Sequence, residues 1–199
     1  MDNKNDTRQA LLDEAAKMFL AEGYDAISIN RLVKRCGVTK GAFYHYFKSK
    51  DELFSQVVVR IIKQFEEYFV KAVLPQEPFK VFLLAYFDYL AYFKNFSFEM
   101  DTKANLFYLI FDGLKRLPSL RSVIAGVYRD LFAAIAQKFK EAQDKGEVIG
   151  SIDPDNFAMG IAVLVEGLIL FEVILADQNT ITADRAESIA EEIWNRIKS

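Results

Sequence analysis

Cysteine and histidine are almost absent from this chain of 199 residues, which contains one of each. A single cysteine, Cys36, cannot form an internal disulfide, which excludes a disulfide-stabilised secreted mini-protein and favours a reducing compartment. A single histidine, His45, leaves few ligands for a zinc site and little for a histidine-based catalytic centre. We therefore expect no metal site and no cofactor.

Proline and glycine are also scarce, with four and nine residues respectively. Apolar residues make up 52% of the chain and charged residues 27%, which excludes a disordered or collagen-like protein and supplies a sizeable core. The acidic N-terminal residues are not followed by the apolar run of a signal peptide, so we expect a cytoplasmic protein.

Apolar residues recur at intervals of three and four almost throughout, which predicts an all-α protein of nine helices. Ser28, Thr39 and Ser49 are expected to cap helices, the last of them in a capping box with Glu52, while Gly23 is expected to end the first helix. The predicted helices cover about 7–22, 29–36, the residues after Thr39, 50–74, 78–95, 101–116, 120–145, 154–176 and the residues from Thr182 onward.

Charge is distributed unevenly along the chain. The twenty residues from Arg31 to Lys50 contain six basic residues and no acidic residue, although the whole chain has a net charge of −3. A solvated helix face is the ordinary interpretation of such a run. A basic patch on an acidic protein also indicates an anionic partner at one place, and the neighbouring residues favour this interpretation.

The segment from residue 28 to residue 47 has the pattern of a helix-turn-helix. A short apolar helix and a turn at Gly37 precede a helix whose Phe43 and Phe47 are expected to face inward. The start of that second helix would lie in the major groove of DNA. There Lys40 is suited to guanine and Ala42 to a thymine methyl group.

The residues from Gly37 to Phe47, followed by those from Lys48 to Leu53, resemble the DNA-binding domain of the tetracycline-repressor (TetR) family of bacterial transcription regulators. The resemblance implies an N-terminal helix-turn-helix domain over 1–54 and a helical effector-binding and dimerisation domain over 55–199. It implies that Tyr44 and Lys50 contact phosphates. The positions that it implies face the groove are Asn30, Lys40, Gly41, Ala42, His45 and Tyr46. The predicted DNA-binding residues are Ser28, Asn30, Thr39, Lys40, Gly41, Ala42, Tyr44, His45, Tyr46, Lys48 and Lys50.

His45 and Cys36 also have simpler interpretations. A lone histidine at a helix end is more often an ordinary surface residue than a ligand or catalyst. A lone cysteine on the apolar side of a short helix is more often a buried thiol than a redox sensor.

Residues 157–176 form an apolar stretch that is long enough to cross a bilayer. It contains Glu166 and Glu172 and has acidic flanks, which argues against a membrane partner. We expect this helix and the last one to form a bundle with a second copy of the chain, making a homodimer. The predicted interface residues are Gly160, Gly167, Phe171, Ile189, Ile193 and Trp194.

Aromatic residues cluster in the middle of the chain. Core packing is the ordinary explanation for any one of them, but together they favour a cavity for a small apolar or aromatic effector. The resemblance also implies an effector within the middle helices. The predicted effector-binding residues are Tyr86, Tyr89, Phe93, Phe107, Tyr108, Phe111, Tyr128 and Phe132.

The sequence predicts a dimeric regulator, a repressor by resemblance, that binds double-stranded DNA at a palindromic operator and is released by the effector. Nucleophile-elbow, phosphate-loop and dinucleotide motifs are absent, which argues against an enzyme. A helical protein-interaction module and a DNA binder that needs no ligand are the remaining alternatives.

Overall fold

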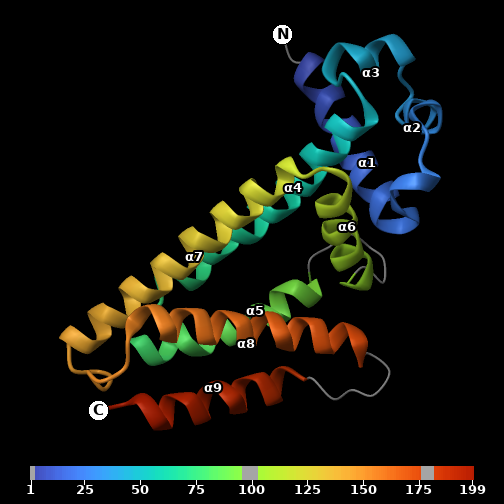
Figure 1. Ribbon diagram of the computed structural model, residues 1–199. Coiled ribbons are helices and arrows are strands. Elements are labelled where there is room, and N and C mark those ends of the chain that lie inside the picture. The colour runs from blue at the N-terminus through green and yellow to red at the C-terminus, as the bar shows by residue number, and fades with distance from the viewer. Residues whose placement is uncertain (1–2, 96–102, 176–181) are drawn as a thin grey trace. The chain divides into compact units, whose positions relative to one another are not determined.

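The computed structural model describes residues 3–95, 103–175 and 182–199, with side chains at 6–88, 107–171, 174–175 and 182–199. Helices account for nearly all of these residues, which confirms the all-α prediction (Figure 1). The elements are α1 (Asn3–Ala26), α2 (Ile29–Arg35), α3 (Lys40–Tyr46), α4 (Lys50–Tyr68), a π-helical turn η1 (Phe69–Val73), α5 (Phe79–Asn95), α6 (Lys103–Arg116), α7 (Ser119–Asp144), α8 (Pro154–Ile174) and α9 (Ala183–Ile197).

Two local features differ from the expected pattern. Helix α1 does not end at Gly23 but kinks there, because this glycine has a φ of 77° that side-chain-bearing residues rarely adopt. After α4 the chain widens into η1, where the Leu74 amide donates to the Phe69 carbonyl at 2.8 Å. A hydrogen bond that spans five residues is the mark of a π-helical turn.

The chain forms two compact units, and their boundaries fall inside α4 and α7. The first unit comprises Met1–Lys63 and Ser97–Ile124, and in it α1 packs against α2 and α6, while α2 packs against α3. Its core is rich in aromatic residues. The largest side chains with almost no exposed surface are Phe19, Phe43, Phe47, Phe54, Leu11, Met18, Leu32 and Leu53.

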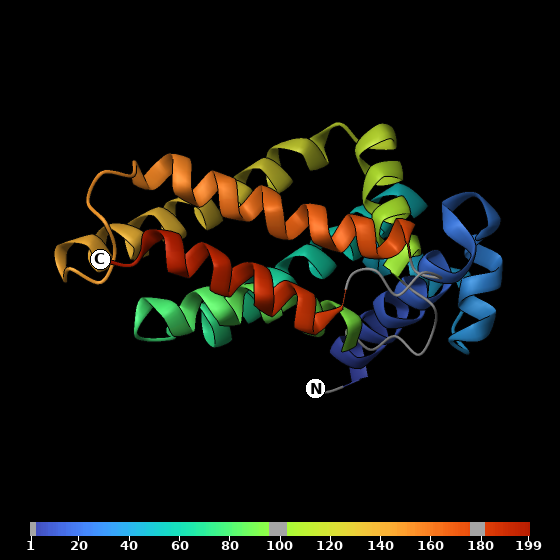
Figure 2. The same cartoon turned by 90° about the horizontal axis from the view of Figure 1, so that it is seen from below.

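The second unit comprises Gln64–Phe96 and Ala125–Ser199. Helix α5 packs against α8, α9 and η1, and the views agree in placing α8 and α9 side by side with opposite chain directions (Figures 1 and 2). The rings of Phe139 and Phe157 stack in its core with centroids 4.0 Å apart. The Glu147 carboxylate accepts a hydrogen bond from the Phe79 amide at 2.8 Å, which fixes the start of α5.

Candidate nucleic-acid interface

Helix α2 is held by the cap that the sequence predicts. The Ser28 hydroxyl accepts a hydrogen bond from the Arg31 amide at 3.2 Å, and Leu32 and Val33 are buried beneath the helix. Gly37, with a φ of 66°, then reverses the chain, and the Val38 amide donates to the Val33 carbonyl at 3.0 Å. This turn determines how α3 follows α2.

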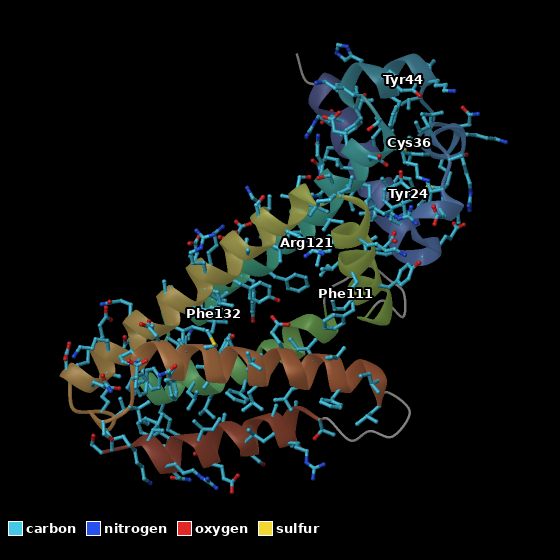
Figure 3. All side chains as sticks on the ribbon, viewed as in Figure 1. Tyr24, Cys36, Tyr44, Phe111, Arg121 and Phe132 are labelled. Carbon is cyan, nitrogen blue, oxygen red and sulfur yellow. The ribbon has the colours of Figure 1, made fainter. Side chains whose placement is uncertain are left out.

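Helix α3 presents one polar face because its other face is buried. The Thr39 hydroxyl accepts from the Ala42 amide at 3.1 Å and so caps the helix. Phe43 and Phe47 have no exposed surface, and their ring centroids lie 5.6 Å apart. The Tyr44 side chain, labelled in Figure 3, is 49% exposed, and its ring lies edge-on to that of Phe43 with centroids 5.2 Å apart.

Each predicted DNA-binding residue lies in or beside this helix-turn-helix. Tyr46 is half-buried, and its ring packs edge-on against that of His45 at 4.9 Å. The half-buried residues of the set are Ala42, Tyr46 and Lys50, and the exposed ones are Ser28, Asn30, Thr39, Lys40, Gly41, Tyr44, His45 and Lys48.

The start of α4 adds a second cap next to α3. The Ser49 hydroxyl accepts from the Glu52 amide at 3.1 Å, as predicted. The return bond differs from a standard capping box, because the Glu52 carboxylate accepts from the Lys48 amide, at 2.7 Å, and not from Ser49. The arrangement fixes the backbone of Lys48 and leaves its side chain exposed.

The six basic residues between positions 31 and 50 are not equally available. Arg31 forms a two-pronged ion pair with Glu22, and Arg35 pairs with Glu14 at 2.5 Å. The Glu22 pKa is lowered mainly by its hydrogen bond with Arg31. The six bases of the sequence therefore overstate the free positive charge, because α1 neutralises both arginines. The bases without an ion pair to a described residue are Lys34, Lys40, Lys48 and Lys50.

Lys50 has a different environment, which the sequence did not indicate. Its ammonium nitrogen lies 3.9 Å from the centre of the Tyr24 ring, and the Arg116 guanidinium lies 4.5 Å from the same centre. The Tyr24 hydroxyl donates to the Asp51 carboxylate, while Arg116 pairs with Asp25. We call this group of side chains from α1, α4 and α6 the Tyr24 cluster.

Burial in the Tyr24 cluster changes two pKa values. Burial, and after it the hydrogen bond to Asp51, raises the pKa of Tyr24 to about 12. Burial, together with the positive charge of Arg116, lowers the pKa of Lys50. The only sequence feature that singles out Tyr24 is its place directly after Gly23, which is a weak indication of a functional residue. Arg116 lies 66 positions beyond Lys50, and no sequence pattern indicates that the two side chains meet.

Cys36 lies at the end of α2, on the side of α1. Its thiol is 3.9 Å from the Ala10 carbonyl oxygen, and burial, with the negative charge of Glu14, raises its pKa. A raised pKa reduces the thiolate that oxidants attack, so the environment favours the simpler interpretation as a packing residue. In the part of the chain that the structure describes, no group of three or more potential ligands could hold a metal ion.

The predicted effector-binding residues are divided between the two units. In the second unit Tyr86 is buried, with its ring 6.1 Å from Phe82 and 5.5 Å from Phe69, and Tyr128 packs 6.0 Å from Phe132. In the first unit Phe107 and Phe111 stack at 6.4 Å, and Tyr108 lies close to Gly23. The side chains of Tyr89 and Phe93 lie outside the described residues.

The predicted interface residues belong to the second unit, on α8 and α9. Helix α8 exposes a row of large apolar side chains at intervals of four and seven, Met159, Val163, Leu170 and Ile174, and Leu164 and Phe171 are exposed beside it. Gly160 and Gly167 lie along the same row, and no atom would meet a Cβ added at either. On α9, Ile189, Ile193 and Trp194 are half-buried. Residues 154–171 are also long and apolar enough to span a membrane, and 39% of this segment is buried in the fold.

Comparison with known proteins now places the chain. Residues 11–57 match the bacterial regulatory proteins of the tetR family, and residues 108–197 match the C-terminal domain of BetI-type transcriptional repressors. The chain belongs to the TetR family. The TetR match at the N-terminus contains α2, the Gly37 turn and α3, which are the elements described above.

Two relatives and one solved structure illustrate the similarity. The TetC protein of transposon Tn10 from Escherichia coli is 44% identical over 62 residues, which are 28% of this chain and 32% of TetC. The match thus spans about a third of that relative. The regulator UidR from E. coli K12 is 25% identical over 93% of this chain and 88% of UidR.

A transcriptional regulator from Saccharomonospora viridis, solved in complex with choline, has the same fold. Its TM-score is 0.78 at 16% identity, and the alignment covers 98% of this chain and 99% of that one. At this level of identity the likeness establishes a shared fold over nearly the whole length and no more.

Proposed function

We propose that the chain is a DNA-binding transcriptional regulator of the TetR family, which represses by binding a palindromic operator as a homodimer in the cytoplasm. The observation that carries this proposal is the division of α3 into two faces. Burial of Phe43 and Phe47 leaves Lys40, Gly41 and Tyr44 exposed on the opposite side. A short exposed helix with almost no side chain at Gly41 and Ala42 can approach base edges in the major groove.

The roles within the interface follow from the chemistry of each side chain. Lys40, at the N-terminus of α3, is suited to hydrogen bonds with guanine, and Ala42 to apolar contact with a thymine methyl group. Tyr44, Lys48 and Lys50 are suited to phosphate oxygens, which position the protein without specifying sequence. His45, Tyr46 and Asn30 would contribute contacts at the groove, and the Ser28 and Thr39 hydroxyls can still donate to phosphates.

The exposed row on α8 supports the homodimer. Val163 and Ile174 are 62% and 61% exposed, and they lie in a row of exposed apolar residues that also includes two glycines. An isologous contact between two such rows would bury this surface and set two copies of α3 at half-sites about 34–36 Å, or a multiple of that, apart. Replacing Val163 with Glu should convert the dimer to a monomer in analytical ultracentrifugation.

A small apolar or aromatic effector completes the proposal. The aromatic residues of the middle helices supply ring surfaces and phenol groups, and the choline-bound regulator from S. viridis shows that a protein of this fold binds a small molecule. Effector binding would favour a dimer state with another half-site spacing, by an amount set by its differential affinity for the two states.

The test begins with selection of bound duplexes from a random pool, which should yield a palindrome. Binding of the selected and of a random duplex is then measured at several salt concentrations. Lys40→Ala should weaken the selected duplex by about 1–3 kcal/mol and the random duplex much less, since it would remove a base contact. Lys50→Ala should weaken both and reduce the salt slope by about one. Lys63→Ala, at an exposed lysine elsewhere on α4, is the matched control. Equal losses on both duplexes after Lys40→Ala would contradict its role.

A further inference from the structure

One carboxyl group in the second unit has a neutral polar partner and, among the described side chains, no basic one. The Tyr128 hydroxyl, on α7, donates to the Glu166 carboxyl, on α8, at 3.1 Å. Burial raises the pKa of Glu166, and the Tyr128 hydrogen bond opposes this effect only in part. Among the described side chains no lysine or arginine pairs with it. A carboxylate in such a place is costly unless a positive charge joins it.

The surroundings of Glu166 are aromatic. The charge of Glu166 raises the pKa values of both Tyr86 and Tyr128, after burial itself, so both phenols lie within its electrostatic reach. The Tyr86 ring stacks with Phe82 at 6.1 Å, and the Tyr128 ring lies 6.0 Å from Phe132, which Figure 3 labels on α7. The faces of aromatic rings attract cations, and their apolar surface suits alkyl groups.

One cation close to this aromatic group, Lys138, is already paired. Lys138 lies 5.5 Å from the centre of the Phe82 ring, and its ammonium group is held by the Glu77 carboxylate at 2.9 Å. It does not contribute to the pKa of Glu166. Tyr128 is 36% exposed, so the pair of phenol and carboxyl can be reached from solvent.

We propose that the second unit binds an organic ammonium ion, with Glu166 as its counter-charge and the rings of Tyr128 and Tyr86 as its walls. The inference rests on the proposed function, because it adds a positive charge to the apolar or aromatic effector. A neutral apolar ligand would leave Glu166 without a counter-charge, whereas an ammonium ion compensates the carboxylate and contacts the ring faces.

The test compares a cation with its neutral isostere on the full chain. Benzyltrimethylammonium and neopentylbenzene have the same shape and differ by one positive charge. In calorimetry the cation should bind at least tenfold more tightly than neopentylbenzene, and Glu166→Gln should abolish that difference. Glu187→Gln, at an exposed position of α9, is the matched control and should change neither affinity. Equal affinities for the two compounds, no binding of benzyltrimethylammonium, or unchanged discrimination in Glu166→Gln would each overturn the inference.

The pH dependence gives a second readout, since benzyltrimethylammonium carries a permanent charge. The described titratable groups that interact with Glu166 are Tyr128 and Tyr86, and both stay protonated below pH 9 because burial raises their pKa values. Affinity should therefore increase as pH rises through the raised pKa of Glu166 and stay flat in Glu166→Gln. A flat profile in the unmodified chain contradicts a carboxylate contact.

Operator binding separates this inference from the proposed function. Glu166→Gln should bind the selected duplex as the unmodified chain does, while benzyltrimethylammonium should no longer release it. If the unmodified chain binds no duplex, the proposed function fails, and ammonium binding is still decided by calorimetry. If it binds the duplex but no ammonium ion, the present inference alone fails.

An independent observation in the first unit assigns a role to Tyr24. Lys50 and Arg116 both lie over its ring, at 3.9 and 4.5 Å, and its hydroxyl is held by Asp51. Arg116 is fixed in turn by Asp112, at 2.7 Å, and by Asp25. We infer that Tyr24 is a positioning residue that holds the Lys50 ammonium group for a phosphate, and that Arg116 links the end of α6 to that contact. This inference also rests on the proposed function.

A double-mutant cycle on DNA affinity tests this role. Tyr24→Leu should weaken duplex binding and reduce the salt slope as Lys50→Ala does, and the double variant should lose little more than either single one. Tyr24→Phe keeps the ring face that Lys50 contacts, so it should retain the salt slope of the unmodified chain. If the hydroxyl bond to Asp51 were the only contribution of Tyr24, Tyr24→Phe would reduce the slope as Tyr24→Leu does. Additive losses, or an unchanged salt slope in a folded Tyr24→Leu variant, would overturn the inference. Loss of duplex binding by the unmodified chain itself would instead contradict the proposed function.

Discussion

The two units place tyrosine in opposite electrostatic surroundings. In the first unit Lys50 and Arg116 lie over the ring of Tyr24, so the chain itself supplies the cations. In the second unit Tyr128 donates to Glu166, and no described basic side chain pairs with that carboxyl. In the first unit the cations and the ring that they contact both belong to the chain, which suits a rigid DNA-binding domain. The arrangement around Glu166 contains no positive charge among the described side chains, which suits a site for a bound cation.

The largest expected effect tests whether the units are stabilised separately. Phe43→Ala and Phe139→Ala each remove a ring with no exposed surface, one from each unit, and each should lower the free energy of unfolding by about 3–5 kcal/mol. Trp194, the one tryptophan, reports on the second unit, while circular dichroism reports on all helices. In urea, Phe139→Ala should shift the Trp194 transition and Phe43→Ala should shift mainly the dichroism. If both variants shift both signals equally, the two units unfold as one.

A smaller effect concerns Glu166, the carboxyl of the second unit that accepts from Tyr128. The pKa of Glu166 is raised in the folded state, so the folded chain binds a proton there more readily than the unfolded chain does. Its contribution to stability is fully present below about pH 4.5 and is lost as pH rises through the raised value, by about 1.4 kcal/mol for each pKa unit. Glu166→Gln should remove this decline in urea titrations at pH 4 to 8. An identical decline in the variant would contradict the assignment.

The smallest effect compares two matched caps. Thr39 and Thr182 accept hydrogen bonds from the Ala42 and Arg185 amides, at 3.1 and 3.2 Å, at the starts of α3 and α9. Each Thr→Ala change should lower the free energy of unfolding by about 1 kcal/mol. Thr39→Ala should also weaken operator binding, measured by fluorescence anisotropy, whereas Thr182→Ala should not. A similar loss of DNA affinity in both variants would show that the effect is one of global stability.

The local parts of the fold were readable from the sequence because their causes are local. A cap acts within three residues, and a turn glycine acts on its own backbone, so Ser28, Thr39 and Gly37 could be assigned from their neighbours. Phe43 and Phe47 are four positions apart, which places both on one face of a helix. Gly23 predicts an interruption of the first helix, and the structure has one there. The sequence does not indicate that the helix resumes after Gly23, as it does up to Ala26.

The long-range parts could not be read in this way. Arg31 and Arg35 pair with Glu22 and Glu14 of α1. No sequence pattern around these glutamates indicates that an arginine of another helix will pair with them. The aromatic residues expected to form one effector site are divided, because α6 packs with α1 in the first unit. Hydrophobic spacing predicts that a residue is buried, but it does not say which element covers it.

The ion pairs that bind Arg31 and Arg35 to α1 have a consequence for engineering. Glu22 and Glu14 lie in α1, outside the helix-turn-helix, and reduce its positive charge by pairing with two arginines of α2. Replacing either with glutamine should free an arginine of α2, and affinity for all duplexes should increase while the groove-facing residues stay the same. If the chain binds DNA as proposed, discrimination between duplexes should then decline, because the added contact would be to phosphates and not to bases.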